Sequence, residues 1–284
     1  MLNEFQQYGH TCVGVEPSPY GKYAVEKYGL DVKNEFFTEG MFEANTFDVV
    51  ILRHVVEHVP DPVAFVKSAT KVLKNGGMAY IEVPNSQWSL ENFYFPEFHV
   101  DHISYFTMNS LTKLLMLAGL NKIIHKEAFN AYMKFPFLMS LSIKEENSKF
   151  EDILDSNFFM NFSVNETINN FSTNFLKYIQ SLNGLKSKNK IAVWGSGSIG
   201  TQFAIDGNFG LENVVYIDPN KISQGLKLSV TGHIINSPEI LKEYNPEILL
   251  IASGWEHDSV IQSRQFISKD TKVLTFNNLL EGKI

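Results

Sequence analysis

Short, mainly apolar runs recur along this chain, and each is followed by a segment with helical signals. Residues 47–52 (FDVVIL), 78–83 and 248–251 are such runs. Runs of this kind are typical of parallel strands that are covered on both faces. Strands that alternate with helices through short connections favour a doubly wound parallel sheet. We therefore predict an α/β protein built from two Rossmann-like doubly wound domains joined by a helical linker.

Capping residues and glycines mark the predicted elements of the first domain, residues 1–145. Asp61 can cap a helix that Pro62 opens, and the Asn-Gly-Gly sequence at 75–77 is expected to end it. A second helix over 109–119 ends on a glycine. We then predict a closing antiparallel pair of strands at residues 123–128 and 133–143.

The remainder of the chain divides into a connector and a second unit. Residues 146–187 are rich in Asn, Ser and Phe with apolar residues near helical spacing, so we predict connecting helices there, ending in a polar linker at 186–190. Strand and helix then alternate again through 188–284, the predicted second domain. Its strands are expected at 191–194, 214–217, 248–251 and 273–276, and its helices at 199–205, 238–243 and 257–266.

Composition excludes several classes of partner. The 284 residues carry a net charge of −7 without a run of Lys and Arg, which argues against nucleic acid. The apolar runs are far shorter than the roughly 20 residues that a membrane helix needs. Residues 1–10 do not resemble a signal peptide, and a single cysteine, Cys12, excludes an internal disulfide. We expect a cytoplasmic protein that does not bind membranes; the oligomeric state stays open.

An acidic residue ends the first predicted strand of the chain. Glu16 follows Gly14 and Val15 at the end of a short β-rich run. A carboxylate in this position can accept hydrogen bonds from both hydroxyls of a ribose, although strand-end acids also cap helices or bind water.

Further motifs follow Glu16 in a fixed order, and together they resemble a known family. GVEP at 14–17, FDVV at 47–50, EHVPDP at 57–62, NGG at 75–77 and EVPN at 82–85 look like the class I S-adenosylmethionine (SAM)-dependent methyltransferases. HISYF at 102–106 resembles a segment of the sugar C-methyltransferases that act on nucleotide-linked sugars. Later motifs of this sequence resemble the carboxy-terminal domain of those enzymes. They are VWGSG at 193–197, IDPN at 217–220, QGL at 224–226, GHII at 232–235 and SPE at 237–239.

The resemblance implies SAM as the cofactor, a sugar or nucleotide-sugar as the acceptor, and a role for each matching residue. Glu16 would hold the ribose of SAM, and Leu52, Arg53 and His54 would line its methionine side. His58 would contact the substrate. His102 would be the catalytic base, with Asp101 beside it. These residue types suit the chemistry, because an imidazole can take a proton near neutral pH and a carboxylate can orient it.

The sequence departs from the family at the acceptor side. HVDH at 99–102 replaces a Tyr-His-Glu-His run, and NAYMKF at 130–135 replaces a His-Gly-Gly-Ser loop. Both carbon and oxygen therefore stay open as the methylated atom. We expect no metal site at His99, Asp101 and His102, because adjacent residues rarely converge on one ion.

The family's first strand and its glycine-rich turn have no counterpart here. Residues 1–8 already resemble the helix that follows that turn, and a cysteine-rich zinc segment is also missing. We therefore expect an amino-terminally truncated chain. Loss of a central strand would leave backbone hydrogen bonds unmade, which is costly in a buried sheet.

The second domain carries its own nucleotide motif. Gly195, Gly197 and Gly200 form a G-x-G-x-x-G sequence between a strand and a helix, and Asp218 ends the next strand. This is the dinucleotide fingerprint in its usual setting. It predicts binding of NAD or another nucleotide, or simply a tight turn. The alternatives to a methyltransferase are thus an NAD-dependent oxidoreductase and a catalytically inactive nucleotide-binding protein.

Overall fold

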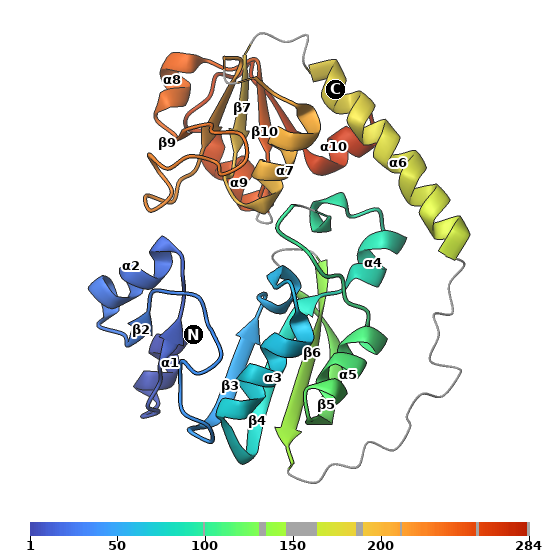
Figure 1. The fold of residues 1–284 in the computed structure, drawn as a ribbon. Coiled ribbons are helices and arrows are strands. Elements are labelled where there is room, and N and C mark those ends of the chain that lie inside the picture. Colours follow the sequence, from blue (N-terminus) through green and yellow to red (C-terminus); the bar gives the residue numbers. More distant parts are fainter. Residues whose placement is uncertain are drawn as a thin grey trace.

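The computed structural model describes residues 1–98, 100–130, 135–145, 164–185, 190–210, 212–253 and 256–282. Its strands form three sheets, of two, four and five strands (Figure 1). The four-stranded sheet has the order β3-β4-β6-β5 and the five-stranded sheet the order β11-β10-β7-β8-β9. An α/β architecture is thereby confirmed. The domain boundaries at 145 and 188 stay predictions.

The four-stranded sheet joins a parallel pair to an antiparallel pair. Its strands are β3 (Phe47–Arg53), β4 (Leu73–Pro84), β5 (Leu120–Asn130) and β6 (Phe135–Lys144). β3 is parallel to β4, whereas β6 is antiparallel to both β4 and β5. The predicted closing antiparallel pair is therefore confirmed.

Two helices pack against this sheet around one apolar cluster. They are α3 (Pro62–Val72) and α5 (Met108–Leu117), which contribute Val66, Leu111 and Leu115 to the cluster. Asp61 caps α3 as predicted, because its Oδ1 accepts a hydrogen bond from the Ala64 N–H at 2.9 Å. The helices thus fix the sheet whose strand ends carry the candidate site.

The Asn-Gly-Gly sequence at 75–77 does not end α3. The helix ends at Val72, and β4 already begins at Leu73. The pairing of β4 with β3 shifts register between Phe47 and Val49, and Gly76 takes a φ of +77° at this irregularity. Glycine tolerates such a conformation, so the two glycines serve a bulged strand.

The amino-terminal residues form a small unit of their own. It contains α1 (Leu2–Gln7), β1 (Gly14–Val15), α2 (Pro19–Tyr28) and β2 (Val32–Lys33). β1 pairs with β2 in parallel, and neither belongs to the four-stranded sheet. The unit lies on the β3 side of that sheet (Figure 1). Within the described residues, β3 is an edge strand, and its Val49 is 46% exposed.

The five-stranded sheet has the strand order of a classical nucleotide-binding fold. Its strands are β7 (Ile191–Trp194), β8 (Val214–Ile217), β9 (Ile235–Asn236), β10 (Ile248–Ile251) and β11 (Lys272–Thr275). All neighbours are parallel. Read in chain order, this is 3-2-1-4-5, in which the order reverses between β7 and β10. Four of the five strands were predicted; β9 has only two residues and gives no apolar run.

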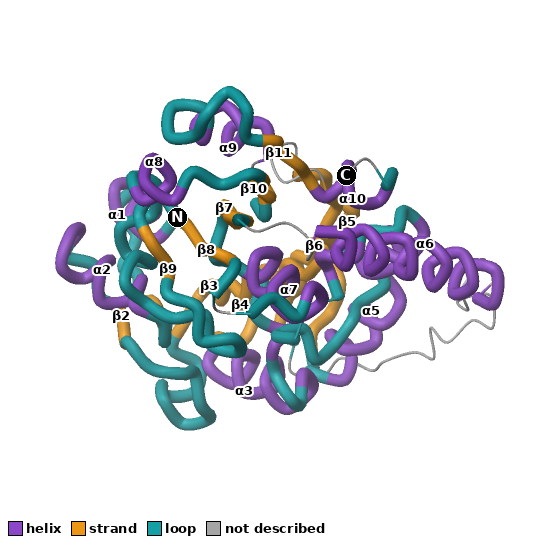
Figure 2. Tube along the Cα trace, turned by 90° about the horizontal axis from the view of Figure 1, so that it is seen from above, coloured by secondary structure: helices purple, strands orange, loops and turns teal. Residues whose placement is uncertain are grey.

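Helices cover both faces of this sheet (Figure 2). One apolar cluster includes residues of α6 (Val164–Leu185), α7 (Ser198–Gly207) and α10 (Phe276–Leu280). A second cluster includes residues of α8 (Ile240–Tyr244) and α9 (Glu256–Ser263). The predicted doubly wound arrangement is confirmed for this sheet. Among the described helices, none is long and apolar enough to cross a membrane.

Two sets of contacts connect distant parts of the chain. Phe95, in the short helix η2 (Phe95–Glu97) after α4 (Ser86–Glu91), packs edge-on against Phe171 and Phe175 of α6. Asn220, after β8, donates a hydrogen bond from Nδ2 to the Tyr20 hydroxyl of α2 at 2.6 Å. The helix α6 occupies part of the predicted connector, whose role as a linker stays a prediction, and residues 186–189 of the polar linker lie outside the described residues.

Candidate functional site

A strained turn follows β3 and begins the candidate site. His54, directly after the strand, has a φ of +49°, in the left-handed region that non-glycine residues rarely adopt. The short helix η1 (Val56–His58) comes next. Strain of this kind costs free energy and is concentrated at functional sites. The turn therefore marks the carboxyl end of β3 as the first place to examine.

The Glu57 carboxylate is buried in this turn. Its side chain is 1% exposed, with Oε1 3.3 Å from His54 Nδ1 and 3.9 Å from His58 Nε2. Its main-chain carbonyl accepts hydrogen bonds from the N–H groups of Ile103 and Ser104, at 2.9 and 3.0 Å. The turn after β3 is thus joined to the segment that carries His102.

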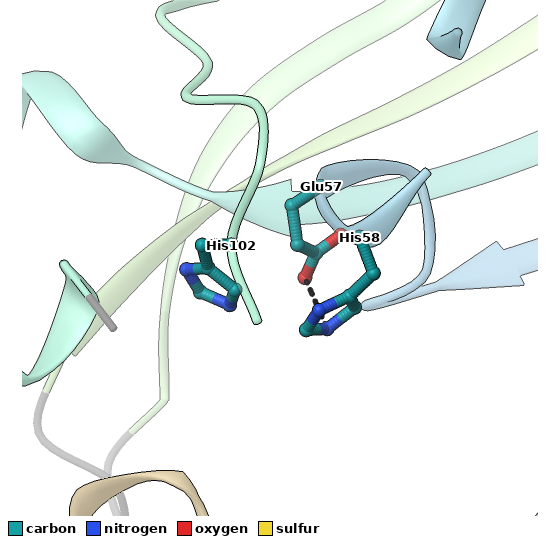
Figure 3. A group of neighbouring side chains, drawn as sticks. All are labelled: Glu57, His58 and His102. Atoms are coloured by element: carbon teal, nitrogen blue, oxygen red, sulfur yellow. Dashed lines mark ion pairs between the residues drawn. The ribbon is translucent and has the colours of Figure 1, made fainter. Parts of the chain in front are cut away.

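His58 and His102 lie face to edge across that junction (Figure 3). Their ring centroids are 4.9 Å apart, with 61° between the planes. His58 Nδ1 lies 2.8 Å from the Asp101 carbonyl oxygen, and His102 Nδ1 lies 3.5 Å from Glu97 Oε1. The side chain of His102 is 8% exposed and that of Glu97 is 4% exposed. Two imidazoles and two carboxylates, Glu57 and Glu97, therefore share one partly buried cluster.

The carboxylate that accompanies His102 is not the one that the sequence suggested. Asp101 was expected to assist His102, but it contributes its main-chain carbonyl to His58, and its side chain is exposed. Glu97 takes the place beside His102. His99, weighed as a metal ligand with Asp101 and His102, lies outside the described residues.

A network of charges adjoins the cluster at the ends of β3 and β4. Glu82 Oε1 lies 2.9 Å from His54 Nε2 and 3.0 Å from an Arg53 guanidinium nitrogen, and the Tyr80 hydroxyl donates to Glu82 Oε2 at 2.6 Å. Burial lowers the pKa of His54, but the contacts with Glu57 and Glu82 outweigh it and raise that pKa to about 9.

The contact with His54 lowers the pKa of Glu82, whereas it raises that of His54. Burial raises the pKa of Glu82, but the hydrogen bonds from His54, Tyr80 and Arg53 outweigh it and lower that pKa to about 2. At neutral pH His54 is therefore a cation and Glu82 an anion. The end of β3 presents two positive side chains, Arg53 and His54.

The other predicted cofactor residues lie at strand ends. Glu16 follows β1, where its Oε1 accepts a hydrogen bond from the Ser18 N–H at 3.0 Å. Asn34 donates to the Glu16 main-chain carbonyl at 2.6 Å. Leu52 packs its side chain against the apolar cluster of the four-stranded sheet, so only its main chain is placed for a ligand.

The second predicted loop is shaped by two of its three glycines. A Cβ at Gly195 would meet the Ala252 carbonyl oxygen at 2.3 Å, and a Cβ at Gly200 would meet the Gly195 carbonyl oxygen at 2.0 Å. Gly197 has open space at the corresponding position. Asp218 accepts hydrogen bonds from the Ser196 N–H and hydroxyl, at 3.1 and 2.6 Å, so its carboxylate holds the loop. Gly195 and Gly200 are required by packing, whereas packing does not require Gly197.

Sequence reasoning missed three carboxylates of the site. Glu57 and Glu82 stood inside the EHVPDP and EVPN motifs, but no role was assigned to them. Glu97 comes just before the HVDH segment. The alternation of β4 was a usable signal, because a glutamate in a buried apolar strand demands a charged partner.

The comparison with solved structures finds methyltransferases at low similarity. A SAM-dependent methyltransferase from Methanosarcina mazei is 18% identical with a TM-score of 0.42, covering 50% of this chain and 85% of that one. A 1,6-didemethyltoxoflavin-N1-methyltransferase from Burkholderia thailandensis, solved with S-adenosylhomocysteine, is 16% identical with a TM-score of 0.40, covering 50% and 65%.

Sequence comparisons find similarity to methyltransferases. Residues 1–125 match the family model of a methyltransferase domain. The ubiquinone biosynthesis O-methyltransferase of Ruegeria sp. (strain TM1040) is 28% identical over 155 residues, covering 49% of this chain and 61% of that protein. That of Bradyrhizobium sp. (strain ORS 278) is 35% identical over 93 residues, covering 31% and 37%. The chain thus spans less than two thirds of these relatives, and its residues 1–125 are similar to a methyltransferase domain.

Proposed function

We propose that this protein transfers a methyl group from SAM to an oxygen or carbon atom of a sugar. The observation that carries the proposal is the position of the His58–His102 pair. His58 lies in η1, shortly after β3, and the pair lies beside two buried carboxylates, Glu57 and Glu97, within the part of the chain that matches a methyltransferase domain. Groups that transfer protons and a cofactor that supplies the methyl group would then meet at one end of the sheet.

The strand ends of the domain fit the parts of SAM. The Glu16 carboxylate, at the end of β1, suits the two ribose hydroxyls. Arg53, whose side chain at the end of β3 is 46% exposed, suits the carboxylate of the methionine moiety, and the protonated His54 beside it is held by Glu57 and Glu82. SAM supplies an electrophilic methyl group when bound, and its sulfur leaves as a neutral thioether.

The acceptor must lose a proton as it gains the methyl group. A hydroxyl gives up its O–H proton, and a carbon beside a carbonyl gives up its C–H proton. His102 is placed to take that proton, with Glu97 3.5 Å from its other nitrogen to orient the ring. His58, held by the Asp101 carbonyl, would contact the acceptor.

Two observations bear on the acceptor. The sugar rests on the resemblance of residues 102–106 to the sugar C-methyltransferases. The matched relatives are named O-methyltransferases, which favours oxygen as the methylated atom. The glycine loop at 195–200 would hold the nucleotide part of a nucleotide-sugar.

The test is methyl transfer from radiolabelled SAM to a panel of nucleotide-sugars, with product mass as the second readout. We expect a gain of one methyl group on at least one sugar. His102→Gln should lower turnover about 10²–10⁴-fold, the range of a lost general base. His125→Gln is the matched control, because His125 contacts Thr112 away from the cluster. SAM binding without transfer to any sugar would reject the sugar acceptor.

The NAD-dependent alternative is tested by the same protein preparation. Calorimetric titration with NAD and with SAM distinguishes an oxidoreductase from a methyltransferase. NAD binding that is lost in Gly197→Val, without any SAM binding, would favour the oxidoreductase.

A further inference from the structure

We propose that Glu57, His58 and His102 bind a divalent transition-metal ion of the Zn²⁺ type, which holds the oxygen of the methyl acceptor. The ion's role in methyl transfer rests on the function proposed above, but the ion site itself does not. Two imidazoles and one carboxylate form a known zinc ligand set, one that leaves a coordination position open for a substrate.

The three side chains already converge. One ligand atom from each lies within 4.8 Å of the other two, and the side chains come together from two separate segments of the chain (Figure 3). Around a tetrahedral zinc ion with bonds of about 2.0–2.1 Å, neighbouring ligand atoms are about 3.4 Å apart. The widest separation therefore has to shorten by about 1.4 Å. Rotation of side chains on η1 and in the His102 segment can provide that.

Outer contacts orient both imidazoles for such a role. His58 Nδ1 is hydrogen-bonded to the Asp101 carbonyl at 2.8 Å, and His102 Nδ1 lies at the longer ion-pair distance of 3.5 Å from the Glu97 carboxylate. This assigns Nε2 of both rings as the ligand atom. Metal-binding histidines characteristically donate their second ring nitrogen to a carbonyl or carboxylate, which fixes the tautomer and the ring orientation.

The burial of Glu57 supplies the third argument. Its side chain is 1% exposed, and among the described residues neither carboxylate oxygen has a hydrogen-bond donor within bonding geometry. Its contacts are ion pairs with His54 and His58, at 3.3 and 3.9 Å. A buried carboxylate is costly unless it is paired or coordinates a metal. Both of these ion pairs involve Oε1, and an ion between Glu57, His58 and His102 would give Oε2 a partner as well.

The ion would change how the acceptor is activated. A hydroxyl bound to a dication loses its proton near neutral pH, as water does on zinc. The proton then passes to solvent water, the oxygen attacks the methyl carbon of SAM, and the carbon–sulfur bond breaks. In this arrangement His102 contributes to the rate by holding the ion. This favours oxygen over carbon as the methylated atom.

Metal binding is tested directly on the 284-residue protein after removal of metals by chelation. We expect one Zn²⁺ per chain by calorimetry, and Co²⁺ should give the visible absorption of a tetrahedral site. His102→Gln and His58→Asn should each weaken Zn²⁺ binding at least 10-fold, and Glu97→Gln should weaken it about 10–100-fold through the outer contact. His257→Gln, an exposed histidine on α9, and Cys12→Ser, the lone thiol, are controls that should bind normally.

Two further measurements keep the proposal open to refutation. Thermal melts of each variant show whether the fold persists, and in the unaltered protein Zn²⁺ should shift the imidazole NMR signals of His58 and His102 together. Absence of Zn²⁺ binding at 10-fold excess, or equal affinity in His102→Gln, would overturn the site. Transfer that survives chelation would reject the ion while sparing the proposed function. Zn²⁺ binding without any methyl transfer would support the ion site and reject the proposed function.

Discussion

The cation at the end of β3 gives a prediction that can be worked through in numbers. His54 lies between the buried carboxylates of Glu57 and Glu82, 3.3 and 2.9 Å away. Its folded-state pKa of about 9 lies above its ordinary value of 6.5, so folding stabilises the protonated form. This stabilisation is complete below pH 6.5 and is lost as the pH rises through about 9.

The size of the effect follows from that change. Raising the pKa of an imidazole from 6.5 to about 9 corresponds to about 3 kcal/mol. Because 33% of the His54 side chain is exposed, solvent screening reduces this, and we expect about 1–2 kcal/mol. That is a sizeable part of the ~5–15 kcal/mol that holds a typical domain folded.

Two assays check the reasoning. NMR titration of the His54 imidazole in the presence of a chelator should give a midpoint near 9, which should fall in Glu82→Gln. Urea unfolding should show His54→Asn to be about 1–2 kcal/mol less stable than the unaltered protein at pH 6, with a smaller gap at pH 10. A midpoint near 6.5, or a gap that does not depend on pH, would refute the charge network.

Three further predictions concern the cofactor, the glycine loop and the two halves of the chain. Glu16→Ala should weaken SAM binding about 10–100-fold by calorimetry, the effect of about 1.5–3 kcal/mol in charge-assisted hydrogen bonds. Gly200→Ala should lower the melting temperature measured by circular dichroism, because its Cβ would lie 2.0 Å from the Gly195 carbonyl oxygen, whereas Gly197→Ala should melt almost normally. Residues 164–284 expressed alone, which keep α6 on the five-stranded sheet, should unfold cooperatively in urea, whereas residues 1–145 alone should aggregate in light-scattering measurements through the β3 edge.

Local signals were sufficient for most of the fold. The Asp61–Pro62 pair located the start of α3, and the apolar runs located β3, β7, β8 and β10. The elements that were predicted wrongly or missed depend on tertiary contacts. The glycines at 76–77 appeared to be a helix stop, yet they form a bulge because β3 lies beside them. β9 is defined by its pairing with β8 rather than by its own residues.

The sequence was sufficient to predict the two histidines of the candidate site but not the carboxylates that contact them. His58 and His102 were singled out, and the structure brings their rings within 4.9 Å. The carboxylate beside His102 was predicted wrongly, because the pairing of acids with imidazoles depends on the path of the chain around η2. Sequence adjacency favoured Asp101 for His102, but the turn directs that side chain outward and brings Glu97 in. Their catalytic roles stay predictions.

The unpaired edge of β3 has a thermodynamic consequence. β1, which precedes Glu16, and β3, which leads to Arg53 and His54, belong to different sheets. Among the described residues, no strand-to-strand hydrogen bond therefore sets the spacing between the two proposed ends of the SAM site. A segment that pairs with β3 would fix that spacing. Linkage is reciprocal, so such pairing would raise the affinity for SAM by the same factor by which SAM strengthens the pairing. Cofactor affinity thereby becomes a measure of whether this edge is occupied.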